Sequence, residues 1–247
     1  MADIRPLAHA PVLEALFDFR VELPPEITPE TLKSLHAEIA GDYPEILERR
    51  RWRSKIEFTN SEQKPPSNED LGVSGYLIKS ADGARAVQFR LDGFTFSQLR
   101  PYSKWEESRD EAKRLWAIYK SVGVTRITRV ATRFINTIDI PQPDAAGIES
   151  FIIGLPPVPA MDLALHSFMN RIQLSDKTAG FSAIVTQALQ APTNPMVATI
   201  LLDIDSFKDG LFDAPFDTAW ATLDKLREFK NKIFFSLITE KAAKLFD

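Results

Sequence analysis

Residues Val12–Glu22 have the sequence VLEALFDFRVE, and this stretch decides the start of the fold. Its apolar positions are Leu13, Ala15, Phe17, Phe19 and Val21, and its charged positions are Glu14, Asp18, Arg20 and Glu22. Only Leu16 departs from the alternation. A period of two residues predicts a β-strand with one face buried in a core.

Outward from this strand, the first half of the chain predicts a helix, a set of antiparallel strands and a second, longer helix. Thr28 caps the first helix. The predicted strands cover about 47–58, 75–80, 85–91 and 94–99, with a polar loop over 60–70. The pair Asp82-Gly83 is the strongest hairpin signal. The long helix that follows carries Trp105 and Trp116 in its apolar stripe.

The second half of the chain predicts the same order of elements. A strand covers about 126–140, a short helix 144–153, and further strands 165–174, 181–190 and 196–207. Asp217 caps a final long helix with apolar positions at Trp220, Leu223, Leu226, Phe229, Ile233 and Leu237. The blocks Asp92-Gly93-Phe94 and Asp205-Ser206-Phe207 each precede an X-Pro-aromatic segment and a Trp-bearing helix, at an offset of about 114 residues. These matches indicate an internal duplication.

Together the elements predict an α+β protein of two pseudo-repeated halves, residues 1–123 and 124–247, each ordered β-α-β(3–4)-α. The halves are expected to share one curved antiparallel sheet as one compact unit. Both long helices should pack on one face in a saddle or helix-grip layout, because each must bury its apolar stripe. The opposite face of the sheet is then the expected binding or dimer surface.

The composition is that of a globular protein of 247 residues, with 44% hydrophobic and 26% charged residues. A net charge of −4, from 34 acidic and 30 basic residues, argues against a protein whose main role is to bind nucleic acid. The absence of cysteine excludes disulfides. No apolar stretch reaches the ~18 residues that a bilayer requires. The first residues lack the apolar core of a secretory signal, so a cytoplasmic protein without membrane contact is expected.

Motifs of the common catalytic classes do not occur in the sequence. The P-loop, the dinucleotide-binding fingerprint and the nucleophile-elbow spacing are all missing. His9, His36 and His166 are far apart and belong to no metal-binding pattern. We therefore expect a protein that binds rather than catalyses and that carries no cofactor.

A dense basic run covers Arg49–Lys55. On a strand, Arg49, Arg51, Arg53 and Lys55 share one face and Trp52 lies on the other. One interpretation is a phosphate-contacting ribbon, which Arg129 and Arg133 of a later strand would extend. The alternative is a solvated edge strand whose charges prevent aggregation.

Two carboxylates, Asp203 and Asp205, share one face of another predicted strand. Carboxylates at this spacing are candidates for a Mg²⁺ ligand pair or an acid/base pair. No glycine or histidine accompanies them, so a polar strand edge is the alternative.

Three blocks of the sequence, taken together, resemble one known family. They are residues 6–15 (PLAHAPVLEA), 92–106 (DGFTFSQLRPYSKWE) and 226–235 (LREFKNKIFF). The chain resembles an uncharacterised, sporadically distributed family of bacterial proteins of about this length, defined by a family model without an assigned activity. The resemblance transfers no site residues. A patchy distribution implies, by association, a place in mobile defence or toxin–antitoxin-like operons.

Three functions are therefore expected, in this order. The first is a non-catalytic interaction or regulatory protein, the partner of an effector in such an operon, which binds another protein or a second copy of itself. The second is a nucleic-acid-binding saddle that uses the Arg49–Lys55 run. The third is a helix-grip protein that binds a small ligand, or a metal-dependent enzyme that uses Asp203 and Asp205.

Overall fold

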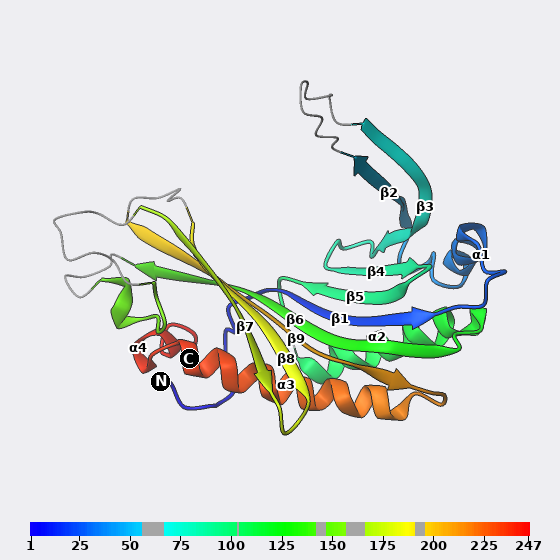
Figure 1. Cartoon of the computed structure of the whole chain (residues 1–247). Coiled ribbons are helices and arrows are strands. Elements are labelled where there is room, and N and C mark those ends of the chain that lie inside the picture. Colours follow the sequence, from blue (N-terminus) through cyan, green and yellow to red (C-terminus); the bar gives the residue numbers. More distant parts are fainter. Residues whose placement is uncertain (56–66, 103, 142–146, 157–165, 191–195) are drawn as a thin grey trace, which may run out of the picture.

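The computed structural model describes residues 1–55, 67–102, 104–141, 147–156, 166–190 and 196–247. These residues form one nine-stranded antiparallel sheet with the order β2-β3-β4-β5-β1-β6-β9-β8-β7 (Figure 1). The strands are β1 (Val12–Glu22), β2 (Glu45–Lys55), β3 (Ser67–Lys79), β4 (Arg85–Arg90), β5 (Gly93–Leu99), β6 (Arg126–Pro141), β7 (Phe168–Asp176), β8 (Phe181–Leu189) and β9 (Val197–Phe212). The prediction of an α+β protein built on a curved antiparallel sheet is confirmed.

The helical elements of the described chain are few and mostly short. They are α1 (Pro29–Ser34), η1 (Leu35–Glu38), α2 (Trp105–Tyr119), η2 (Lys120–Val122), η3 (Ile148–Ser150), α3 (Asp217–Leu237) and α4 (Glu240–Ala243). Thr28 caps α1 by accepting a hydrogen bond from the Thr31 backbone N–H, as predicted. No helix in this part of the chain is both long enough and apolar enough to cross a bilayer.

The strand β1 lies in the middle of the sheet, between β5 and β6. Its register places Phe17 opposite Phe96 and Phe19 opposite Phe94. The predicted alternation places Phe17 and Phe19 in the core, where both are fully buried. Leu13 is an exception at 40% exposure, because the pairing of β1 with β6 shifts register between Val12 and Glu14 and breaks the alternation there.

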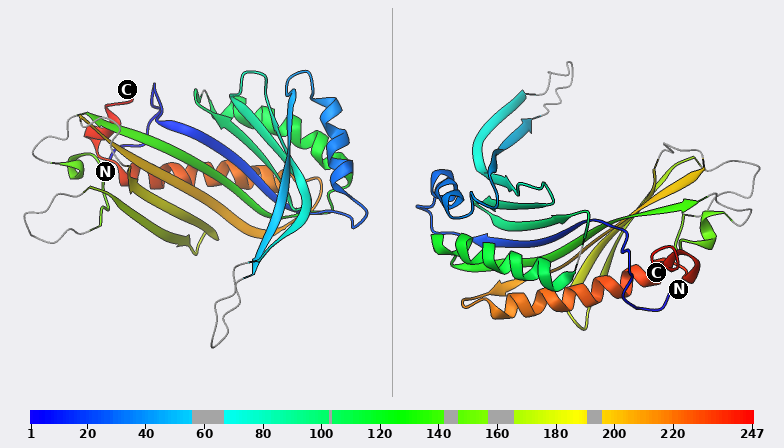
Figure 2. Two further views of the ribbon diagram at one scale, coloured as in Figure 1. Left: turned by 90° about the horizontal axis from the view of Figure 1, so that it is seen from above. Right: turned by 180° about the vertical axis from the view of Figure 1, so that it is seen from behind.

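The helices α2 and α3 lie along one face of the sheet (Figure 2). α2 contacts β5, and α3 contacts β6 and β9. Between the helices, the Trp105 indole N–H donates to a carboxylate oxygen of Asp224 at 3.0 Å. Phe19 reaches this layer from β1, with its ring centroid 5.0 Å from those of both Trp116 and Trp220. One core therefore draws on residues of both 1–123 and 124–247. We call the other face of the sheet, opposite α2 and α3, the open face.

Some element boundaries differ from the predictions. β3 already begins at Ser67, because pairing with β2 extends it into the loop predicted over 60–70. The described part of the helix predicted over 144–153 is only the 3-10 turn η3, because an antiparallel bridge from Ile152 to Ile238 draws the chain out of helical geometry. Asp217 is the first helical residue of α3 rather than its cap, since Phe216 occupies the cap position. Residues 56–58, 60–66, 144–146 and 165 of the predicted elements lie outside the described residues.

Candidate functional site

The open face carries a charged network at the centre of the sheet. Successive side chains of a strand point to opposite faces, so Phe17 and Phe19 in the core place Asp18 on the open face. The same alternation brings Arg90 from β4, Arg129 from β6 and Asp205 from β9 to this face. Four strands from both halves of the chain thus supply one cluster of charged groups.

Asp18 is the hub of this network. One of its carboxylate oxygens lies 3.1 Å from an Arg90 guanidinium nitrogen and accepts a hydrogen bond from the Thr95 hydroxyl at 2.6 Å. Its other oxygen lies 3.6 Å from Arg129. Burial opposes the charge of Arg90, but Asp18 and Asp92 beside it outweigh that effect and raise the pKa of the guanidinium. The carboxylate is therefore paired on both sides.

Arg129 links Asp18 to β9. Its guanidinium donates to Asp205 at 3.1 Å and lies over the Phe207 ring, 4.4 Å from the ring centroid. Only 11% of its side chain is exposed. Burial raises the pKa of Asp205 above the ordinary value, although Arg129 and Arg133 act in the opposite direction.

Asp203 has its own arginine partner. Arg133 donates two hydrogen bonds to its carboxylate, at 2.8 and 2.6 Å. This bidentate pair raises the pKa of Arg133. Asp203 and Asp205 therefore lie on one face as predicted from their spacing, but each faces a guanidinium, which repels a divalent cation. No group of three or more potential metal ligands occurs among the described residues.

A shallow hollow of about 290 Å³ lies over the network. Its charged lining comprises Asp18, Arg20, Arg49, Arg90, Arg129, Arg133 and Asp205. Arg49 belongs to the predicted basic run, and it donates to Gln88 of β4. The structure thus brings Arg49 together with Arg129 and Arg133 and leaves the rest of the run elsewhere.

The remainder of the run lies on a two-stranded ribbon that we call the arm, made of residues 50–55 of β2 and 67–74 of β3. β3 pairs with β4 only over Gly75–Lys79, so the two strands of the arm pair with no further strand among the described residues. It rises from the sheet on the side away from the long helices (Figure 1). Gly75 allows this departure, because a Cβ at that position would lie 2.3 Å from the Phe89 carbonyl oxygen.

The arm presents both paired and free cations. Arg50 lies 2.6 Å from Asp70, and Arg53 lies 3.5 Å from Glu69. Arg51 forms no ion pair with the described residues. The neighbouring Trp52 is 61% exposed. Lys55 ends β2 opposite Ser67.

The sequence patterns did not identify three residues of this network, Asp18, Arg90 and Thr95, as site residues. Their signal was present, since Asp18 lies on the polar side of the first alternating strand. The missing information was the strand order, which alone places β4, β5, β6 and β9 within reach of this carboxylate.

Removal of Arg129 should show how the network contributes to stability. We expect Arg129→Met to lower the free energy of unfolding by about 1–3 kcal/mol, because Asp205 is left half-buried without its hydrogen-bonding partner. Arg53→Met on the arm, where the side chains of Arg53 and its partner Glu69 are each 65% exposed, should cost less than about 1 kcal/mol. Urea denaturation of both variants measures the difference. Equal losses would contradict the central role of Arg129.

The fold and the open face define an α+β protein with a broad, exposed antiparallel sheet. Comparison with family models and with curated proteins finds no match for this chain. The resemblance of residues 6–15, 92–106 and 226–235 to an uncharacterised family therefore stays a hypothesis.

Proposed function

We propose that this chain is a non-catalytic interaction protein that holds a protein partner between the arm and the open face. The observation that carries the proposal is the arm itself, a ribbon that leaves the sheet and exposes Trp52 and Arg51 beside an open sheet edge. Tryptophan and arginine are the residue types most enriched at the energetic centres of protein interfaces. The described contacts give neither side chain a role in the core.

The chemistry of the arm suggests the form of the partner. β2 is at the end of the strand order, so its outer backbone groups are available to an added strand. The described charges of the arm, Arg50, Arg51 and Arg53 against Glu69 and Asp70, leave a basic excess. An extended segment with acidic side chains and one apolar side chain for Trp52 fits this surface. A regulatory role beside an effector protein, which the family resemblance implies, is part of the proposal.

Nucleic acid is the second candidate, favoured by the exposed arginines of the arm. The open face weighs against it, because Arg90, Arg129 and Arg133 are already paired with carboxylates. Phosphate contacts would need those charges to be free, since neutralisation of phosphates drives such binding.

The internal duplication remains a proposal of its own. The strand order supports it, since β5 and β9 flank the central pair β1–β6 and a long helix follows each of them in sequence. A duplicated layout would explain why both long helices lie on one face and leave the other face continuous.

An arm variant tests the function. We expect Arg51→Glu combined with Trp52→Ala to weaken partner binding at least ten-fold, because hot-spot side chains of this kind each contribute about 2 kcal/mol or more. The partner is isolated with the wild-type protein and its affinity is measured by calorimetry. Lys232→Met, an exposed position on α3, is the matched control and should bind as the wild type does.

Two further measurements decide between the candidates. Hydrogen exchange of the complex should protect the amides of β2. Unchanged affinity of the arm variant, or protection confined to the helix face, contradicts the proposal. A salt titration with a labelled nucleic-acid 20-mer covers the second candidate. Steeply salt-dependent binding that Arg51→Glu with Arg53→Glu abolishes would replace a protein partner with nucleic acid.

A further inference from the structure

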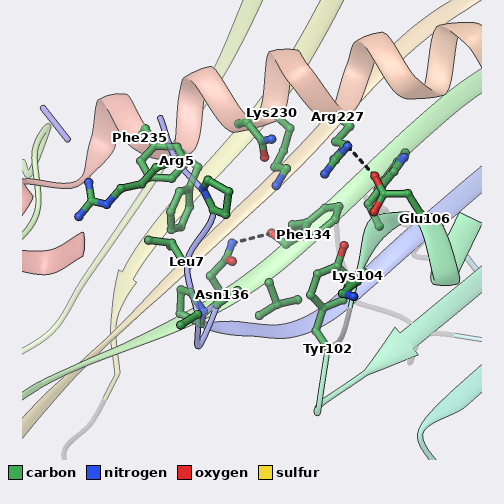
Figure 3. Close-up of a pocket in the computed structure, with 18 residues that line it drawn as sticks. Arg5, Leu7, Tyr102, Lys104, Glu106, Phe134, Asn136, Arg227, Lys230 and Phe235 are labelled. Carbon is green, nitrogen blue, oxygen red and sulfur yellow. Dashed lines mark hydrogen bonds and ion pairs between the residues drawn. The ribbon is translucent and has the colours of Figure 1, made fainter. Parts of the chain in front are cut away.

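A cavity of about 480 Å³ lies on the helix side of the sheet (Figure 3). It is open to solvent on one side and is lined by α3, the start of α2, β6 and the segment before β1. Its aromatic lining residues are Tyr102, Trp105, Phe134, Phe234 and Phe235. The volume falls in the range of roughly 300–1,000 Å³ that is typical of small-molecule sites. The sheet separates this cavity from the open face.

One lysine occupies the cavity without an anionic partner. Lys230 of α3 is 8% exposed and is the only charged residue among the buried residues of the described chain. Its Nζ lies 3.7 Å from the centroid of the Phe134 ring, and Figure 3 shows its side chain pointing into the cavity toward that ring. No ion pair or hydrogen bond joins this Nζ to a described residue.

The other charges around the cavity do not neutralise Lys230. Glu106 at the start of α2 is paired with Arg227 of α3 at 3.4 Å. Arg5 of the N-terminal segment is paired with Glu240 at 3.0 Å and with Asp247 at 3.1 Å. Lys104 adds a further positive charge. The lining thus carries four cationic side chains against one carboxylate, and that carboxylate is already paired.

A buried, unpaired ammonium group destabilises the protein unless something else recovers its cost. Burial, with a smaller contribution from the charge of Arg227, lowers the pKa of Lys230 to about 7. A methionine would fill the same space without that cost. The Lys230 side chain therefore destabilises the free protein. Its ammonium group becomes stabilising once an anion occupies the cavity and pairs with it.

We propose that this cavity binds a small organic acid, whose carboxylate pairs with Lys230 and whose apolar body lies against the aromatic walls. The carboxylate supplies the counter-charge that the protein lacks, and the rings of Trp105 and Phe134 supply the apolar surface. This site does not depend on the arm or on a protein partner.

Binding of the acid is coupled to a proton. At pH 8 most Lys230 side chains are neutral in the free protein, and a carboxylate beside the Nζ favours the ammonium form. The complex therefore takes up close to one proton per ligand at this pH. Arg227, Glu106, Lys104, Arg5 and Tyr102 face the same space, and uptake that vanishes with Lys230→Met assigns the proton to Lys230.

Calorimetric titration with benzoate, 2-naphthoate and octanoate tests the site, with benzamide and 2-naphthamide as uncharged counterparts. We expect at least one acid to bind at least ten-fold more tightly than any of the amides. The apparent binding enthalpy at pH 8 should differ between Tris and HEPES, which reports proton uptake. Lys230→Met should weaken the acid at least ten-fold and remove the buffer dependence, whereas Lys232→Met should change neither.

Equal affinity for acids and amides, the absence of binding by any acid, or acid binding that Lys230→Met leaves intact overturns the proposal. Where Lys230→Met fails to fold, the wild-type comparison of acid with amide and of the two buffers decides alone. Binding or non-binding of the acids at this cavity does not depend on the arm. Failure of this proposal is therefore distinguishable from failure of the proposed function.

Discussion

The free energy of unfolding is expected to rise by about 3 kcal/mol between pH 7 and pH 9.5 through Lys230 alone, and Lys230→Met should lack this rise. The pKa of this lysine is about 7 in the folded protein against an ordinary value of 10.5. Between these values the unfolded chain binds more protons than the folded one, so higher pH favours the folded state. About one pH unit or more below the folded-state pKa the lysine is charged in both states, and its contribution no longer changes with pH.

Urea denaturation of the wild type, Lys230→Met and Lys232→Met at pH 7, 8 and 9.5 measures this effect. The difference between the first two proteins isolates Lys230, because the other titrating groups are common to both. We expect Lys230→Met to be the more stable protein at pH 7 and the gap to close as the pH rises. Parallel pH profiles for all three proteins contradict a buried, easily deprotonated Lys230.

Phe19→Ala should destabilise the protein by about 3–5 kcal/mol. Phe19 is fully buried, and its ring meets Trp116 of α2 and Trp220 of α3, each at 5.0 Å between ring centroids. Its loss leaves a cavity where β1 and both long helices meet. Rigid neighbouring rings limit how far this region can collapse to fill it.

The control for this variant lies on the same strand. Leu13→Ala changes a side chain that is 40% exposed and should cost well under about 1 kcal/mol. Chemical denaturation followed by tryptophan fluorescence reports both variants. A loss below about 1 kcal/mol for Phe19→Ala would show that the three elements do not share one core.

The elements with a strong local pattern were predictable from the sequence, whereas the short helix expected over 144–153 was not. The alternation of Val12–Glu22 and the stripe of Trp105 and Trp116 both follow from burial on one side of a regular element. The order of the strands was not predictable, because it depends on contacts between residues far apart in the chain. The partners of Asp18 could not be named without that order.

Lys230 is a different case, because its place within the apolar stripe of the last helix could have been recognised from the sequence. The predicted stripe of the last helix includes Leu226 and Ile233, and Lys230 follows the first by four residues and precedes the second by three. A lysine at such a position lies on the buried face of the helix. The structure buries Lys230 and leaves Phe229, which belongs to the predicted stripe, only partly buried. A charged residue within an apolar stripe was therefore the sequence feature that could have pointed to the cavity.

The central place of β1 in the sheet affects how the chain folds during synthesis as well as the final structure. Its pairing partner β6 begins at Arg126, more than 100 residues after the end of β1 at Glu22. At ribosomal rates of about 5–20 residues per second, the start of β6 follows the end of β1 from the ribosome by roughly 5–20 s. During that interval β1 presents an unpaired edge, and its hydrophobic face lacks Trp220. We therefore expect the nascent first half to be the species most prone to aggregation during synthesis, because this strand edge is still unpaired.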